Sequence, residues 1–98
     1  MPERHVLYQY ASCPFCHRVR QFLESQGIDV ELRDTLGDPA ARRELVLGGG
    51  QGMVPCLRIE RAGEVRWLYE SMDIIDYLRR YHADESATVS NHQAGGNS

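Results

Sequence analysis

The sequence predicts one α/β domain with elements in the order βαβ, then α, then ββα, and a four-stranded mixed sheet flanked by helices. Three observations predict it. Apolar residues alternate in short strand-like runs, and elsewhere they recur every three to four positions, as in amphipathic helices. Glycine- and proline-bearing segments separate these runs. A length of 98 residues suits a single small core.

The first half of the chain has the pattern of strand, helix and strand. Residues 5–10 form the first strand-like run, and the apolar residues of 14–26 share one helix face. Gly27 follows, where a helix cap is expected. Residues 28–33 then alternate between apolar and charged side chains, which predicts a second strand. Such a strand–helix–strand unit is parallel and right-handed.

The next helix has clear signals at both ends. Asp38 is placed to cap it, Pro39 occupies its first position, and residues 40–47 continue it. The glycine-rich segment 48–52 ends it.

Two strands and a helix complete the predicted domain. Residues 56–60 and 65–69 are strand-like runs joined by a glycine-bearing link, which predicts an antiparallel hairpin. Ser71 can cap a last helix, whose apolar face continues to Tyr81. The following residues are polar and almost without large apolar side chains. We therefore expect a folded domain over residues 1–82 and a disordered polar tail over residues 83–98.

Composition excludes several classes of partner. All eleven cations are arginines, and against fourteen acidic residues the net charge is −3, so nothing favours nucleic acid. No apolar stretch reaches the roughly 20 residues of a membrane span. The N-terminal residues lack the apolar core of a signal peptide. Three cysteines are a poor match to an extracellular disulfide framework, so we expect a cytoplasmic protein.

The segment Cys13-Pro14-Phe15-Cys16 stands between the first strand and the first helix. Proline suits the first helical position, which makes Cys13 the cap. Unpaired N–H groups and the positive dipole end meet there and favour a thiolate. Cys16 lies one turn on, at a separation compatible with a disulfide. We expect an exposed nucleophile at Cys13 and a shielded resolving thiol at Cys16.

Other interpretations of the cysteines stay open. The pair is half of a zinc site only if Cys56 and one histidine, from His5, His17, His82 or His92, complete four ligands. It could also be two inert buried cysteines, although its strand–helix context favours redox chemistry. Cys56 is either a small core residue or a third redox-active thiol. We expect no bound metal.

Three separated motifs together resemble a glutaredoxin of the thioredoxin-fold superfamily. They are CPFCHRV from Cys13, MVP ending at Pro55 and YESMDII from Tyr69, and the resemblance covers about residues 5–82. It implies the thioredoxin (glutaredoxin-like) fold. It also implies an enzyme, a thiol–disulfide oxidoreductase that reduces protein disulfides or glutathione mixed disulfides, with glutathione as co-substrate.

The resemblance also implies a glutathione site. In the family, the residue matching Val54 pairs its backbone with the cysteine of glutathione, and the proline matching Pro55 is cis. The γ-glutamyl end binds at the start of the last helix, through backbone N–H groups at Ser71, with Asp73 facing its ammonium. Glu70 together with Ser71 is similar to the corresponding pair in the N-terminal domain of glutathione transferases.

Tyr10 is a departure from the family pattern. Glutaredoxins usually carry lysine or arginine three residues before the first cysteine, where it meets the glycine carboxylate of glutathione. Tyr10 occupies that position here. The resemblance then implies that Arg42 or Arg43 replaces this cation, or that Gln51 donates as a neutral group.

The leading hypothesis is a monomeric enzyme whose partners are glutathione and disulfide-bearing or glutathionylated proteins. A second hypothesis is a glutathione-binding iron–sulfur cluster carrier, with Cys13 as a ligand. A third is a domain like the N-terminal domain of glutathione transferases, without transferase activity, because the polar tail cannot build the helical second domain.

Overall fold

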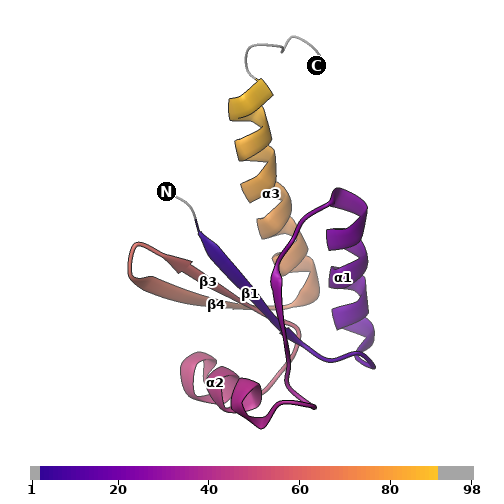
Figure 1. Ribbon diagram of the computed structural model, residues 1–98, viewed down its shortest axis with the longest axis vertical. Coiled ribbons are helices and arrows are strands. Elements are labelled where there is room, and N and C mark those ends of the chain that lie inside the picture. The colour runs from indigo at the N-terminus through magenta and orange to yellow at the C-terminus, as the bar shows by residue number, and fades with distance from the viewer. Residues whose placement is uncertain (1–2, 91–98) are drawn as a thin grey trace.

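The structure is a computed structural model that describes the backbone of residues 3–90 and the side chains of residues 3–83. Within this range, four strands and three helices follow the predicted order (Figure 1). They are β1 Arg4–Gln9, α1 Pro14–Gln26, β2 Glu31–Asp34, α2 Pro39–Gly49, β3 Cys56–Arg61, β4 Glu64–Tyr69 and α3 Ser71–Ser90. The order βαβ–α–ββα confirms the predicted thioredoxin-like α/β fold.

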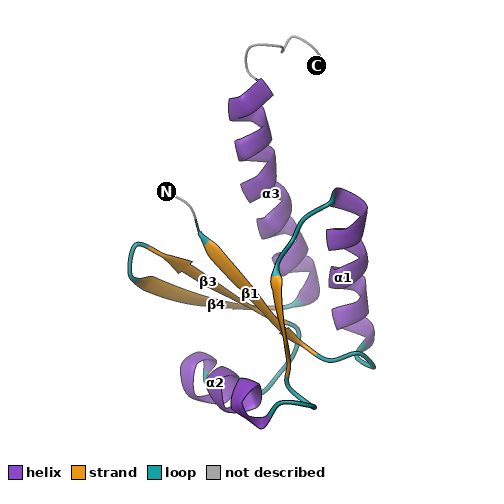
Figure 2. Ribbon diagram, viewed as in Figure 1, coloured by secondary structure: helices purple, strands orange, loops and turns teal. Residues whose placement is uncertain are grey.

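The four strands form one mixed sheet in the order β2-β1-β3-β4. β1 pairs with β2 in parallel and with β3 antiparallel, and β3 and β4 form the antiparallel hairpin. Successive residues of β1 point to opposite faces. Leu7 packs with α1 and α3, whereas Val6 and Tyr8 pack with α2. The helices α1 and α3 therefore lie on one side of the sheet and α2 on the other (Figure 2). The dithiol motif therefore starts α1 at the end of the central strand β1.

The second strand starts later than its apolar alternation predicts. β2 begins at Glu31, and the preceding residues belong to a loop. Gly27 has a φ of 66° and caps α1 as expected, and the Ile28 N–H donates to Leu23 O at 3.0 Å. Ile28 is therefore part of the turn that closes α1 and not of β2. Ile28 and Val30 pack against the core from this loop.

Helix α2 continues past the position where glycine was expected to end it. Gly48 and Gly49 are its last two residues, and Gly50, with a φ of 88°, is the cap. A Cβ at Gly48 would overlap the Trp67 ring, and one at Gly49 would overlap the Tyr69 hydroxyl. These glycines therefore serve close packing of α2 on β4.

Helix α3 is longer than predicted. It runs to Ser90, whereas the sequence pattern assigns residues 83–98 to a disordered tail. Residues 83–90 contain neither glycine nor proline, so nothing in them ends a helix that tertiary packing has already started. The remaining tail, residues 91–98, lies outside the described residues. Among the described helices, none is both long and apolar enough to cross a membrane.

Candidate functional site

Cys13 caps helix α1, as the sequence predicts. Its backbone is extended, with φ −81° and ψ 120°, and Pro14 is the first helical residue. The Cys13 Sγ accepts a hydrogen bond from the Cys16 N–H at 3.2 Å. The Cys13 N–H in turn donates to Tyr10 O at 3.2 Å. The sulfur is therefore held at the N-terminus of the helix, where the dipole is positive.

Cys13 is more buried than expected, whereas Cys16 is shielded as the sequence predicts. Cys13, expected to be exposed, is only 5% accessible, and Cys16 is fully buried. The reason is the cap itself, because the Cys13 sulfur turns onto the first turn of α1 rather than toward solvent. Burial, assisted by the hydrogen bond with Cys13, raises the pKa of Cys16 to about 12. Cys16 is thus a protonated thiol, as expected of a resolving cysteine.

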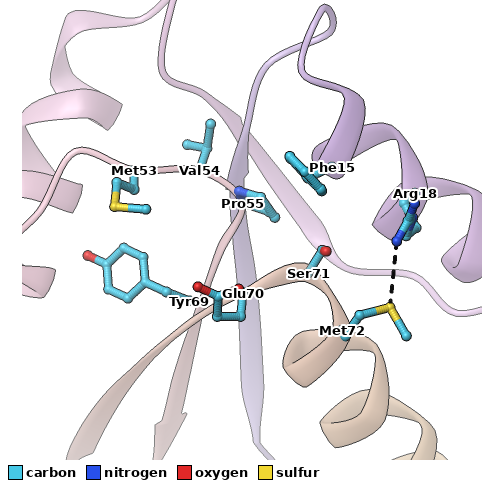
Figure 3. Close-up of a pocket in the computed structure, with 9 residues that line it drawn as sticks. All are labelled: Phe15, Arg18, Met53, Val54, Pro55, Tyr69, Glu70, Ser71 and Met72. Atoms are coloured by element: carbon cyan, nitrogen blue, oxygen red, sulfur yellow. Dashed lines mark hydrogen bonds between the residues drawn. The ribbon is translucent and has the colours of Figure 1, made fainter.

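A pocket of about 310 Å³ opens beside the dithiol helix (Figure 3). Three segments far apart in the sequence meet around it: the start of α1, the loop before β3, and the corner between β4 and α3. The lining residues are Phe15, Arg18, Met53, Val54, Pro55, Tyr69, Glu70, Ser71 and Met72. The pocket brings together four of the predicted site residues, namely Val54, Pro55, Glu70 and Ser71.

The loop at Val54 offers a free backbone edge to this pocket. The Val54–Pro55 peptide bond is cis. Among the described residues, neither the N–H nor the C=O of Val54 takes part in a hydrogen bond. The Tyr69 hydroxyl donates to Gln51 O at 3.1 Å and so anchors the loop from the pocket wall. Gln51 contributes this backbone carbonyl, whereas its exposed side chain does not line the pocket.

The corner between β4 and α3 presents the start of a helix. Glu70 O accepts from the Ile74 N–H at 3.0 Å, which makes Glu70 the cap, where Ser71 was expected. Glu70 has a φ of 76°, a left-handed conformation that costs about 1–2 kcal/mol in a non-glycine residue. Ser71 is the first residue of α3 and is 7% accessible. The first N–H groups of α3 have no partner within the helix, which suits them to bind an anion.

Other predicted residues lie away from the pocket. Asp73 is exposed in the first turn of α3 and is not among the lining residues. Tyr10 contributes its carbonyl to the loop before Cys13, and its side chain does not line the pocket. Arg42 and Arg43 line a separate groove on α2. No residue expected to replace the cation at position 10 therefore lines the pocket.

Five lining residues were not assigned to the site from the sequence. They are Phe15, Arg18, Met53, Tyr69 and Met72. The Arg18 Nη1 lies 3.9 Å from the Met72 Sδ, so the two side chains meet between α1 and α3 (Figure 3). Each of the five stands inside or next to one of the three motifs. That proximity is the signal that could have identified them.

The third cysteine belongs to the core. Cys56 is fully buried and packs in the cluster that includes Tyr8 and Leu45. Burial raises its pKa to about 11, although the Tyr69 side chain acts in the opposite direction. These features favour the core interpretation over a redox role. In the part of the chain that the structure describes, no three histidine, cysteine or acidic side chains are grouped to hold a metal ion.

Comparison with known proteins gives one family and two kinds of relative. Residues 7–86 match the sequence family described as Glutathione S-transferase, N-terminal domain. Prostaglandin E synthase 2 of Mus musculus is 32% identical over 76 residues, which are 78% of this chain and 19% of that protein. Glutaredoxin 3 of Escherichia coli (strain K12) is 32% identical over 54 residues, 55% of this chain and 65% of that protein. The chain thus matches only part of each relative.

A solved structure also matches most of this chain and only part of its own chain. The maleylacetoacetate isomerase of Anaeromyxobacter dehalogenans 2CP-1, with GSH bound in its active site, superposes with a TM-score of 0.64 at 27% identity. The superposition covers 83% of this chain and 38% of the isomerase chain. The match therefore extends over most of the domain and leaves more than half of the isomerase without a counterpart.

Proposed function

Since this chain belongs to the glutathione S-transferase N-terminal domain family, we propose that it is a glutathione-dependent thiol–disulfide oxidoreductase. The relatives support a protein whose chemistry involves glutathione. The observation that carries the finer proposal is the capping geometry of Cys13. Its sulfur sits on the N-terminus of α1, with a second thiol one turn away. Neither cysteine lines the pocket, but Phe15 between them does. A conjugating transferase does not need a second thiol at this place.

Glutathione fits the pocket as a short peptide. Its cysteine pairs its backbone with the free N–H and C=O of Val54, as an added strand would. Its γ-glutamyl carboxylate binds the first N–H groups of α3 at Ser71 and Met72. The ligand's ammonium pairs with Glu70, which lines the pocket, rather than with Asp73, which does not. The thiol of the bound glutathione is then directed toward Cys13.

The reaction proceeds by two exchanges. The Cys13 thiolate attacks a substrate disulfide, forms a mixed disulfide and releases one substrate thiolate, which takes up a proton. The Cys16 sulfur loses its proton and attacks Cys13, which releases the second thiol and leaves a Cys13–Cys16 disulfide. Two molecules of glutathione then reduce this disulfide and leave as glutathione disulfide. Two electrons therefore pass from glutathione to the substrate.

The high pKa of Cys16 is compatible with this order of events. Burial raises that pKa, and the hydrogen bond and charge of Cys13 raise it further. The contribution of Cys13 disappears once its sulfur is part of a mixed disulfide. Cys16 therefore becomes easier to deprotonate when it is needed as a nucleophile.

A glutathione-coupled disulfide reduction assay tests the proposal. Cys13→Ser should abolish turnover, because it removes the attacking sulfur. Cys16→Ser should retain removal of glutathione from a glutathionylated protein, a reaction that needs one thiol. Cys56→Ala is the matched control and should keep wild-type turnover, since Cys56 lies in the core. Activity retained by Cys13→Ser would refute the proposal.

A further inference from the structure

Arg20 binds the loop that leads into the dithiol. Its Nη1 donates to the Gln9 Oε1 at 2.6 Å and lies 3.3 Å from Tyr10 O, and its Nη2 lies 3.3 Å from Ala11 O. One guanidinium on α1 thus contacts three consecutive residues at the end of β1. The five donors of arginine in a rigid fork make this arrangement possible, whereas lysine could not reproduce it.

The same loop positions Cys13. Tyr10 O accepts from the Cys13 N–H as well as from Arg20. Gln9 is 8% accessible, and its backbone carbonyl also accepts from the Thr35 N–H at 3.0 Å, so its position is determined by the sheet. Arg20 therefore connects a rigid strand end to the helix whose first turn holds the Cys13 sulfur. A shift of this loop would move Cys13 directly.

The charge of Arg20 acts on Cys16. Within the described residues, no carboxylate lies within ion-pair distance of Arg20, so its charge is not neutralised locally. Its positive charge acts to lower the pKa of Cys16, against the larger effect of burial. Arg20 does not line the pocket, so this charge cannot replace the position-10 cation in contacting glutathione.

We propose that Arg20 is the positioning residue of the dithiol, because it binds the loop from Gln9 to Ala11 to α1 and places a positive charge near Cys16. This inference rests on the proposed function. Arg20 does not line the pocket and so does not contact the substrate. Replacing Arg20 should change the equilibrium between the dithiol and its disulfide and should make the loop before Cys13 less rigid. It should have little effect on the contacts with glutathione.

The equilibrium with glutathione tests this role. Protein dithiol and glutathione disulfide exchange to give protein disulfide and two glutathione molecules, and alkylation followed by mass analysis measures the fractions. Arg20→Met should raise the equilibrium constant for oxidation about threefold or more, because the reduced dithiol loses a stabilising positive charge and the loop that holds the Cys13 N–H loses its anchor. Arg20→Lys keeps the charge but cannot make all three loop contacts, so it should recover only part of this change. Arg80→Met is the control, since it removes an equal charge from an exposed ion pair on α3.

A second readout reports on the loop. The Cys13 amide hydrogen should exchange with solvent about tenfold faster in Arg20→Met, because the carbonyl that accepts it is less fixed. Should Arg20→Met fail to fold, Arg20→Gln retains a donor, lacks the charge and gives the same equilibrium readout.

The outcomes separate the two proposals. If wild-type protein forms no reversible Cys13–Cys16 disulfide, both the proposed function and this inference fail. If wild type forms the disulfide and the charge-removing variants Arg20→Met and Arg20→Gln have the wild-type or a smaller oxidation constant, the inference alone is overturned.

Discussion

The Cys13 sulfur accepts a hydrogen bond from the backbone N–H of Cys16 at 3.2 Å, so the second cysteine of the motif holds the first. The two sulfurs nevertheless have different environments. Cys13 caps the N-terminus of α1 and remains 5% accessible, whereas Cys16 lies one turn inside the helix and is fully buried. The division into attacking and resolving sulfur follows from this difference.

Selective alkylation should report that division. Burial raises the pKa of Cys16 to about 12 and that of Cys56 to about 11. At pH 7 such thiols are ionised to the order of one part in 10⁵ and one part in 10⁴ respectively. Iodoacetamide should therefore label Cys13 alone in the folded protein, as measured by peptide mapping. Unfolded protein should be labelled at all three cysteines, and early labelling of Cys16 in folded protein would contradict the assignment.

Glu70 should lower the stability of the fold and strengthen the binding of glutathione. Its φ of 76° strains the backbone, and glycine adopts that conformation freely. Glu70→Gly should leave the free energy of unfolding unchanged or raise it by up to about 1 kcal/mol, measured in urea. It should weaken glutathione binding about threefold to tenfold, measured by calorimetry, because the pairing with the ligand's ammonium is lost.

Glu70→Gln is the matched control for that substitution. It keeps the backbone strain and removes only the charge, so it should weaken binding to a similar extent without a gain in stability. Wild-type affinity in both variants would show that Glu70 does not contact the ligand.

Gly49 should matter for the pocket through Tyr69. A Cβ at position 49 would overlap the Tyr69 hydroxyl, which donates to Gln51 O. Gly49→Ala should therefore displace Tyr69, lower the free energy of unfolding by about 1–3 kcal/mol and weaken glutathione binding. In a Tyr69→Phe background the hydroxyl is absent, so the same substitution should cost clearly less. Equal costs in both backgrounds would mean that this overlap is not the cause.

Acid should weaken the attachment of β1 to α3. Burial acts to raise the pKa of Glu3, but hydrogen bonds with Tyr77 and His5 outweigh it, and that pKa lies below its ordinary value of 4.5. Because the folded-state pKa is the lower one, ionised Glu3 stabilises the fold above pH 4.5, and this contribution disappears as pH falls through the lowered value.

Glu3→Gln tests that contribution by urea unfolding at several pH values. The variant should be less stable than wild type at pH 7 by about 1 kcal/mol, and the difference should shrink as pH falls below 4.5. Tyr77→Phe removes one of the hydrogen bonds and should reduce the pH dependence in part. A difference between wild type and Glu3→Gln that is constant with pH would be inconsistent with this role.

The local features of the site could be predicted from the sequence. Proline after Cys13 identifies the helix start, because only the first turn accepts it without loss. Gly27 marks the end of the same helix through its left-handed conformation. Motif resemblance then linked Val54, Pro55, Glu70 and Ser71, and the structure brings these residues to one pocket.

The features that depend on distant partners could not be predicted. The donors of Arg20 reach residues nine to eleven positions earlier, and no helical pattern indicates this. Cys13 is buried because its sulfur turns onto the first turn of α1. The alternation of apolar residues in β1 does not predict this orientation. Residues 83–90 have no helical pattern of apolar residues, so the sequence does not predict that α3 continues to Ser90.

The most direct test of the central claim is mass analysis of Cys16→Ser after exposure to glutathione disulfide. With the resolving thiol absent, the first exchange cannot proceed further. The account predicts one glutathione per protein, located on Cys13 by peptide mapping and removed by reduced glutathione. A glutathione located on Cys56, or no glutathione on the folded protein, would contradict it.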